Sequence, residues 1–356
     1  MPRLALPLAV LLISCSAKAQ ELFEFYTGAR QLAMGGAYTA AVNDETSMLT
    51  NPAGLGRLRD YFFTIADPEI HAGSEDSNIV NSANYSSASS TQGLLNALNN
   101  AKGKHFHAKA QMFPSLAAPN FGIGLLAKVS VDGDVDTAAT RFRYDYTNDY
   151  AGVMAFCFRF WDGIIKLGVS GKLINRVEVA KELDPTVTTY ELKTLANEGV
   201  GASTTAGLVF TMPIMWLPSL AVVVKDIGNT NYTLSNGMFY DTANRPRQTQ
   251  QSVDAGFSLS PILANHVRAT IAGDVQGATT LSEETDALKR YHVGVELNIA
   301  DFFFLRGGVN QRYWTAGVEF ATRYFQLQAT SYGEEVGTAT VNKEDRRYVG
   351  KLAIRF

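Results

Sequence analysis

Apolar and polar residues alternate with a period of two along most of the chain after about residue 60. Ile123, Leu125 and Val129 share one face of such a segment, whereas Lys128 and Asp132 share the other. This alternation is typical of β-strands that have one apolar and one polar face. The pattern predicts about fourteen strands, at 61–73, 104–117, 120–133, 141–160, 163–180, 200–213, 216–226, 249–260, 266–276, 289–300, 302–310, 312–321, 323–333 and 345–356.

The length of these segments distinguishes between two kinds of all-β protein. Most are about 9–14 residues long, whereas strands of soluble proteins average about 5–6 residues. A tilted strand that crosses a bilayer needs about 9–11 residues. Length therefore favours a transmembrane antiparallel β-barrel, with a soluble all-β fold as the alternative.

The links between the predicted strands alternate between short and long, with one exception near Gln311. Short turns on one rim and long loops on the other are typical of outer-membrane barrels. The sheet must close, because a free edge in hydrocarbon would leave backbone N–H and C=O groups without partners. The apolar face is then expected to contact lipid and the polar face to line the lumen.

The first nineteen residues have the features of a secretory signal peptide. An apolar run at 4–13 is followed by Ala17-Lys18-Ala19, a small-residue cleavage site. We therefore expect a signal peptide at 1–19. A lipoprotein signal at Leu12-Ile13-Ser14-Cys15, with Cys15 as the lipidated residue, is the alternative. Cleavage after residue 19 leaves Cys157 alone, so the mature chain has no intramolecular disulfide.

Residues 20–60 form short helical turns of small residues rather than strands. Asn51 suits a helix N-cap and Pro52 the first helical position, and Gly54 or Gly56 can end the turn. Since this segment precedes the first strand, it begins at the short-turn rim. It could fold into the lumen as a plug or remain a periplasmic tail.

The run GARQLAMGGAYTAAVNDETSMLTNPAGL, at 28–55, resembles the N-terminal signature of the FadL-like outer-membrane family. It is most similar to the PorV/PorQ-like branch. The resemblance implies a fourteen-stranded barrel at 61–356 with a lumenal hatch at 20–60. Carried over to this chain, the hatch motif consists of Asn51, Pro52, Ala53, Gly54 and Leu55.

The C-terminal residue, Phe356, follows alternating apolar positions. A terminal aromatic residue of this kind resembles the signal that the outer-membrane assembly machinery reads. We therefore expect this machinery and outer-membrane lipid to be partners of the chain.

Composition excludes several classes of function. The net charge of −3 argues against a nucleic-acid binder. No phosphate loop, zinc-protease helix or nucleophile elbow is present, so neither a cofactor nor catalytic residues are expected. His105 and His107 share a strand face and could form half of a metal site, but a solvated pair is the simpler interpretation.

Two non-enzymatic functions follow for a monomeric barrel in the bacterial outer membrane. The first is protein secretion, in which a PorV-like barrel receives a secreted protein through the loops at 74–103 and 227–248. The alternative is a FadL-type transporter of long-chain fatty acids or other hydrophobic small molecules. The mainly polar inner face favours the first. An outer-membrane enzyme is a third alternative.

Overall fold

A computed structural model describes residues 24–76, 90–138, 140–187, 190–240, 242–279, 286–337 and 341–356. The signal peptide expected at 1–19, with Cys15, lies outside these residues. One antiparallel sheet contains seventeen strand segments. They are β1 (Phe62–Ala66), β2 (Glu69–Gly73), β3 (His105–Met112), β4 (Ser115–Ala118), β5 (Phe121–Val135), β6 (Phe142–Phe160), β7 (Ile165–Leu183), β8 (Asn197–Thr211), β9 (Ser219–Lys225), β10 (Ser252–Leu259), β11 (Ile262–Ala264), β12 (Val267–Val275), β13 (Tyr291–Ile299), β14 (Phe303–Asn310), β15 (Tyr313–Ala321), β16 (Phe325–Glu335) and β17 (Glu344–Arg355).

Three pairs of these segments, β1/β2, β3/β4 and β10/β11, are single strands interrupted by a proline. Pro68, Pro114 and Pro261 lie at the three breaks. Proline has no N–H to donate to the ladder, so regular pairing stops there. Seventeen segments less these three breaks give fourteen strands, as the alternation predicts.

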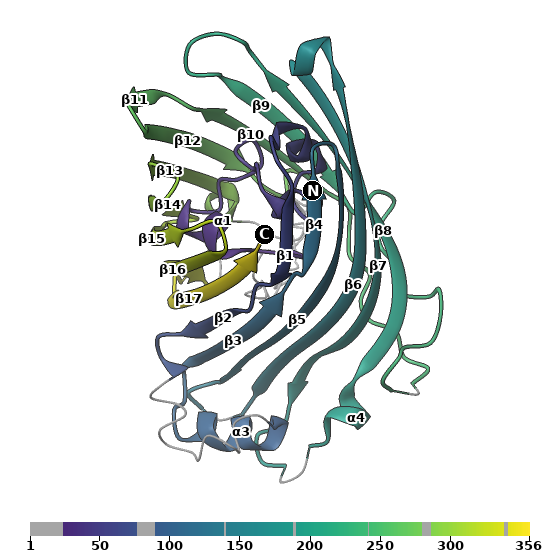
Figure 1. Cartoon of the computed structure of the whole chain (residues 1–356). Helices are drawn as coiled ribbons and strands as arrows, with labels where there is room; N and C mark the ends of the chain where they lie inside the picture. Colours follow the sequence, from purple (N-terminus) through teal and green to yellow (C-terminus); the bar gives the residue numbers. More distant parts are fainter. Residues whose placement is uncertain are drawn as a thin grey trace, which may run out of the picture.

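The sheet closes on itself, because the first strand pairs with the last. Thr64 of β1 lies opposite Arg355 of β17, and Ile70 of β2 lies opposite Gly350. Figure 1 shows the resulting barrel, with the N-terminal segment inside it. On β6 the even-numbered side chains from Tyr150 to Phe160 are exposed on the outer wall. The predicted transmembrane β-barrel is therefore confirmed.

The short turns and the long loops lie at opposite rims, as predicted. The exception near Gln311 is a tight two-residue turn between β14 and β15, and Gln311 takes a φ of +58° to make it. The helices of the described residues are α1 (Ala29–Ala33), η1 (Glu45–Met48), η2 (Pro52–Arg57), α3 (Thr91–Asn99), η3 (Trp161–Gly163), α4 (Leu192–Leu195) and η4 (Ala287–Arg290). None of these helices is long and apolar enough to cross a membrane.

The barrel wall is uneven in height. The strands β6 and β7 each have nineteen residues, whereas β9 has seven. At the long-loop end of β6, Phe142 and Tyr144 lie on the outer face yet are buried, because α3 packs on them through Leu94 and Leu98. The alternation does not predict α3, which lies within the 74–103 loop.

The C-terminal residue lies at the short-turn rim. The backbone N–H of Phe356 donates to the carbonyl of Phe63 at 2.9 Å, and the N–H of Phe63 donates back at 3.1 Å. Its ring is exposed and contacts Tyr324. Recognition of Phe356 by assembly machinery remains a prediction.

Candidate functional site in the barrel lumen

Residues 24–60, the lumenal segment, lie inside the barrel and cross its lumen. Helix α1 contacts β14 to β17, η1 contacts β4 to β6, and η2 contacts β6 to β8. Most of the segment is buried although it contains only short helices. It is therefore held mainly by the barrel wall, because the cluster formed largely from its own residues, around Met34 and Tyr38, is small.

The residues that the sequence assigns to the hatch motif begin η2. The Asn51 side chain caps this helix by accepting from the N–H of Ala53 at 3.1 Å, with Pro52 at the first position, as predicted. Its amide also donates to the carbonyl of Thr39 at 2.8 Å. Asn51 thus joins two turns of the lumenal segment. The remaining motif residues are buried here too: Ala53, Gly54 and Leu55.

Three glycines in the wall let the lumenal segment approach the strands closely. A Cβ on Gly168 of β7 would lie 2.1 Å from the backbone nitrogen of Ala53. A Cβ on Gly207 of β8 would lie 2.0 Å from Oδ1 of Asn51. A Cβ on Gly122 of β5 would lie 2.4 Å from the sulfur of Met48. These distances are far below van der Waals contact, so larger residues would displace the segment.

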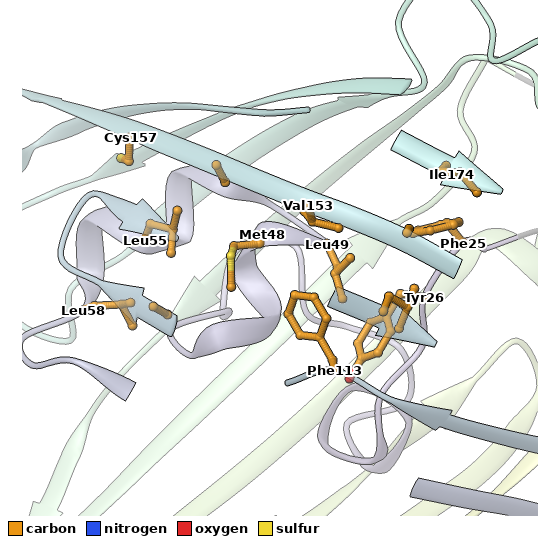
Figure 2. Close-up of a cluster of buried hydrophobic side chains, with 14 of the residues drawn as sticks. Phe25, Tyr26, Met48, Leu49, Leu55, Leu58, Phe113, Val153, Cys157 and Ile174 are labelled. Carbon is orange, nitrogen blue, oxygen red and sulfur yellow. The ribbon is translucent and has the colours of Figure 1, made fainter. Parts of the chain in front are cut away.

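Apolar side chains fill the space between the lumenal segment and the wall (Figure 2). Phe25, Leu49 and Leu55 from the segment pack with Phe113, which lies between β3 and β4, and with Ile174 of β7. Burial of such side chains contributes about 1.5–3 kcal/mol each. The rest of this cluster is Tyr26, Met48, Leu58, Ala117, Leu126, Ala151, Val153, Ala155, Cys157 and Tyr232.

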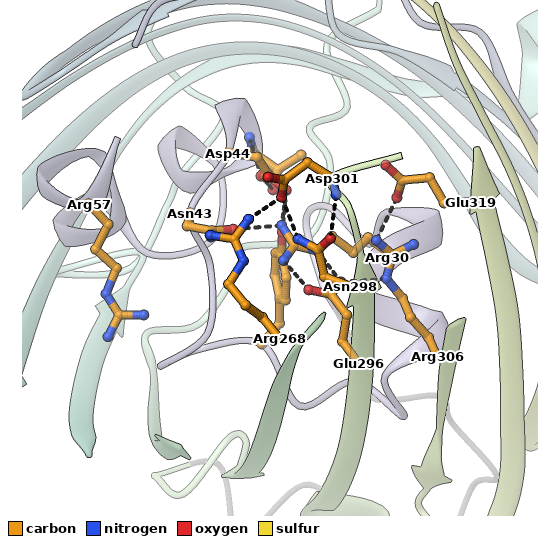
Figure 3. Close-up of polar contacts among 12 residues, drawn as sticks. Arg30, Asn43, Asp44, Arg57, Arg268, Glu296, Asn298, Asp301, Arg306 and Glu319 are labelled. Atoms are coloured by element: carbon orange, nitrogen blue, oxygen red, sulfur yellow. Dashed lines mark hydrogen bonds and ion pairs between the residues drawn. The ribbon is translucent and has the colours of Figure 1, made fainter. Parts of the chain in front are cut away.

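A buried group of charges, the Arg30 cluster, joins the segment to the opposite wall. It consists of Arg30, Asp44, Glu296, Arg306 and Glu319 (Figure 3). Arg30 donates to both oxygens of Glu296, at 2.9 and 2.8 Å, and to Asp44 at 2.9 Å. Arg306 donates to Glu296 at 2.6 Å and to Glu319 at 2.5 Å. Two guanidinium groups thus bind three carboxylates.

The position of Asp44 next to Arg30 lowers the pKa of the Asp44 carboxyl. Burial by itself would raise the pKa of the Asp44 carboxyl. The charge of Arg30 and hydrogen bonds from Thr46, Tyr38 and Arg30 outweigh burial and lower the pKa to about 2. Asp44 is therefore ionised throughout the neutral range.

Wall side chains also satisfy the backbone of the lumenal segment. The Asp274 carboxylate accepts from the N–H groups of Tyr38 and Thr39, at 2.6 and 2.7 Å. Nδ1 of His292 lies 2.8 Å from the carbonyl of Gly35, and because a carbonyl only accepts, Nδ1 carries the proton. These bonds supply partners that the short helices cannot provide for themselves.

A cavity of about 850 Å³ lies on the long-loop side of the lumenal segment. Its lining includes Glu24, Thr27, Gln31, Leu32 and Gly36 of the segment. The strands and loops contribute the remaining wall. Eight lysines and arginines and six carboxylates line the cavity in all. The lumen is thus open toward the loops, blocked by the segment and strongly polar.

The histidine pair predicted to share a face does so. His105 and His107 both point inward and are buried, and Nδ1 of His107 lies 2.6 Å from Asp132. His105 lies within 3.9 Å of carboxylates of Asp132 and Asp134. In the described part of the chain, no group of three or more His, Cys, Asp or Glu is arranged to hold a metal ion.

The period of two places Glu296 and Glu319 on the polar faces of their strands, but it does not identify Arg30 as their partner. The one available signal is that Arg30 is the lone charge in the stretch from Gly28 to Ala41, which otherwise consists of small, apolar and neutral residues. A charge in such a segment needs a buried partner.

Comparisons with known proteins identify solved structures that have a similar fold. No protein-family model matches the sequence, and no curated protein matches it. The toluene transporter TbuX of Ralstonia pickettii has a similar structure, with a TM-score of 0.54, 12% identity and coverage of 93% of this chain and 98% of that chain.

Two further solved structures resemble the chain. The toluene transporter TodX of Pseudomonas putida has a TM-score of 0.53, 9% identity and coverage of 95% and 99% of the two chains. A FadL homologue of Pseudomonas aeruginosa has a TM-score of 0.50, 9% identity and coverage of 93% and 98%. At such low identities these likenesses establish a shared fold and nothing more specific.

Proposed function

We propose that this chain is a FadL-like channel of the bacterial outer membrane for small molecules, in which residues 24–60 act as the hatch. The observation that carries the proposal is the lumenal segment itself, which blocks the barrel below a cavity open toward the loops. A small molecule that enters from the loop side would pass only when the segment moves.

The chemistry of the lumen supports an amphipathic substrate, such as a long-chain fatty acid. A bare hydrocarbon gains little from the charged wall of the cavity, whereas a molecule with one polar end can pair with it. The apolar cluster around Phe25 and Phe113 lies where the segment meets the wall, so it would contact the apolar body when the hatch moves. The fold neighbours named as transporters of toluene support a small-molecule function.

Protein secretion, the first prediction from the sequence, stays a prediction. The fold neighbours favour the small-molecule alternative over the PorV/PorQ-like assignment. Purification of the chain from its native envelope, followed by identification of bound proteins, tests secretion. Recovery of a secreted protein at stoichiometric amount would support that function instead.

Native mass spectrometry of the purified chain with fatty acids of several chain lengths tests the proposal. We expect one bound fatty acid, bound more weakly when Ser130→Trp places an indole ring in the cavity. Thr204→Trp, on an exposed outward position of β8, is the matched control and should retain the ligand. Absence of bound lipid at every chain length, or equal binding by both variants, would contradict the proposal.

A further inference from the structure

The loop between β9 and β10, at 226–251, passes from the lumen to the outside of the barrel. Inside, Tyr232 is buried, with its hydroxyl 2.9 Å from Thr249 and its ring 4.9 Å from the Arg176 guanidinium. Outside, the ring of Phe239 lies 5.3 Å from that of Tyr150 on the outer face of β6. The loop therefore encloses the edge of β8, where the short strand β9 ends.

A buried carboxylate fixes the outer part of this loop. Glu198 of β8 is fully buried and accepts from the N–H of Met238 at 2.7 Å and of Phe239 at 3.0 Å, and it also accepts from the N–H of Tyr240. Asn175 donates to the same carboxylate at 2.9 Å. These bonds hold residues 238–240 in one orientation.

The contact with Glu198 also requires the glycine that precedes Met238. A Cβ on Gly237 would lie 1.8 Å from the Glu198 carboxyl carbon. The loop is therefore built to lie on this carboxylate, and the side chains that follow are directed by it. This arrangement leaves Met238 74% exposed and Phe239 53% exposed.

The exposed part of the loop at 233–240 has no charged side chain and includes three large apolar ones. Residues 233–240 read TLSNGMFY and contain no Asp, Glu, Lys or Arg. Leu234 is exposed together with Met238 and Phe239. Met238 and Phe239, held in this orientation by Glu198, would each be less favourable in contact with water than when buried, by up to about 1.5–3 kcal/mol. A covering medium is therefore expected.

The level of the loop along the barrel identifies that medium. From Tyr150 to Phe160 the outer face of β6 is exposed, and these ten steps at about 3.3 Å and a tilt of about 40° span about 25 Å. That height equals the apolar band of an outer-membrane barrel. Phe239, on Tyr150, lies at the loop-side limit of this band, and the lipid-facing wall continues directly below it.

We propose that Met238 and Phe239 form a membrane anchor that inserts into the outer leaflet at the boundary between headgroups and acyl chains. Lipid acyl chains are the occupant, because the patch is continuous with the lipid-facing wall and lacks the charges that would direct a protein partner. The anchor would also fix the height of the barrel in the bilayer.

Single-tryptophan variants reconstituted in phosphatidylcholine vesicles test the proposal. Trp161, Trp216 and Trp314 are replaced by phenylalanine, and one tryptophan is introduced as Phe239→Trp. Leu173→Trp, on the lipid-facing wall, is the positive control, and Val187→Trp, in the loop after β7, is the aqueous control. Quenching of the tryptophan fluorescence is measured with lipids brominated at carbons 6 and 7, which are shallow, or at carbons 11 and 12, which are deep.

We expect brominated lipids to quench the tryptophan fluorescence of the Phe239→Trp protein, as they do in the Leu173→Trp protein. In the Phe239→Trp protein the shallow bromines should quench more strongly than the deep ones. The Val187→Trp protein should be quenched by neither lipid. Quenching of Phe239→Trp no greater than that of Val187→Trp would overturn the proposal. Protection of Phe239→Trp from aqueous iodide without lipid quenching would also overturn it, because that result indicates a protein partner or a second copy.

A second substitution tests the role of the carboxylate. Adding Glu198→Ala should reduce lipid quenching in the Phe239→Trp protein and leave it unchanged in the Leu173→Trp protein. Unchanged quenching in the Phe239→Trp protein would overturn the role of Glu198. The Leu173→Trp protein with the same added substitution reports whether the barrel remains inserted.

Discussion

At the scale of single residues, Arg30 is the main polar link between the lumenal segment and the wall. It is bound to Asp44 of the same segment and to Glu296, which lies 266 residues later in the chain. Buried guanidinium–carboxylate pairs of this geometry contribute most when both partners are present, because the loss of one leaves the other desolvated and unpaired. This asymmetry makes Arg30 the most informative residue to change.

Arg30→Ala should loosen the lumenal segment while the strands stay paired. Arg306 still binds Glu296, so we expect a loss of about 2–3 kcal/mol in the free energy that holds the segment. That loss corresponds to roughly 30- to 150-fold faster amide exchange over residues 29–48. Hydrogen exchange read by mass spectrometry measures it. Arg323→Ala, at an exposed short turn, is the control; equal exchange in both variants would contradict the role of Arg30.

The low pKa of Asp44 predicts how acid affects the segment. A carboxyl whose pKa falls from 3.8 to about 2 on folding adds stability that is full above about pH 4 and lost as the pH falls through 2. Amide exchange over 29–48 should therefore be unchanged between pH 7 and pH 4, after correction for intrinsic rates, and accelerate below. Asp44→Asn should lose part of this acid response, and an identical response in both proteins would contradict the assignment.

At the scale of elements, the close approach of η2 to β7 and β8 depends on residues without side chains. Its partner strands supply Gly168 and Gly207 where the helix passes. A helix of six residues has little stability in water, so its position is set by this contact and by the Asn51 cap.

Gly168→Val should displace η2 from the wall while the strands of the barrel stay paired. The added atoms would overlap the backbone of Ala53, whereas at Gly171, on the same strand, nothing lies within 4 Å. Gly171→Val is thus a matched control for the loss of strand glycine. Ion conductance in planar bilayers should rise for Gly168→Val and stay at the level of the unmodified chain for Gly171→Val. Closed channels for both variants would show that η2 does not block the lumen.

Local patterns predict the elements of the wall better than those that cover it. The period of two locates all fourteen strands, and the three interruptions coincide with prolines. The Asn51-Pro52 start of η2 also follows from local preferences. Local preferences do not predict helix α3, because its nine residues lie in a long loop. The helix is stabilised where its Leu94, Leu95 and Leu98 pack on strands β5 to β7, which follow it in the chain.

At the scale of the whole molecule, the barrel wall has its own hydrogen-bonded structure, whereas the lumenal segment fills the space inside it. Every strand is paired with two neighbours, so the hydrogen bonding of the wall does not depend on the segment. The segment, in contrast, has no sheet of its own and depends on the wall for its partners.

Removal of residues 24–60 should therefore leave a folded but open barrel. We expect unchanged β-content by circular dichroism and a large, continuous conductance, whereas the full chain is closed. Loss of β-structure in the truncated chain would show that the segment is needed for folding of the wall. A folded truncated chain with no conductance would mean that other parts of the chain close the lumen.

The order of residues by itself determined the strands, their number and which faces contact lipid, because these depend on neighbours one and two positions apart in an environment that allows no unpaired backbone. Tertiary structure decided where residues 24–60 lie, which charges pair across the lumen, and that α3 and residues 238–240 cover the outer wall. Such contacts join positions up to several hundred residues apart, so their energies depend on the closed barrel and not on any local pattern.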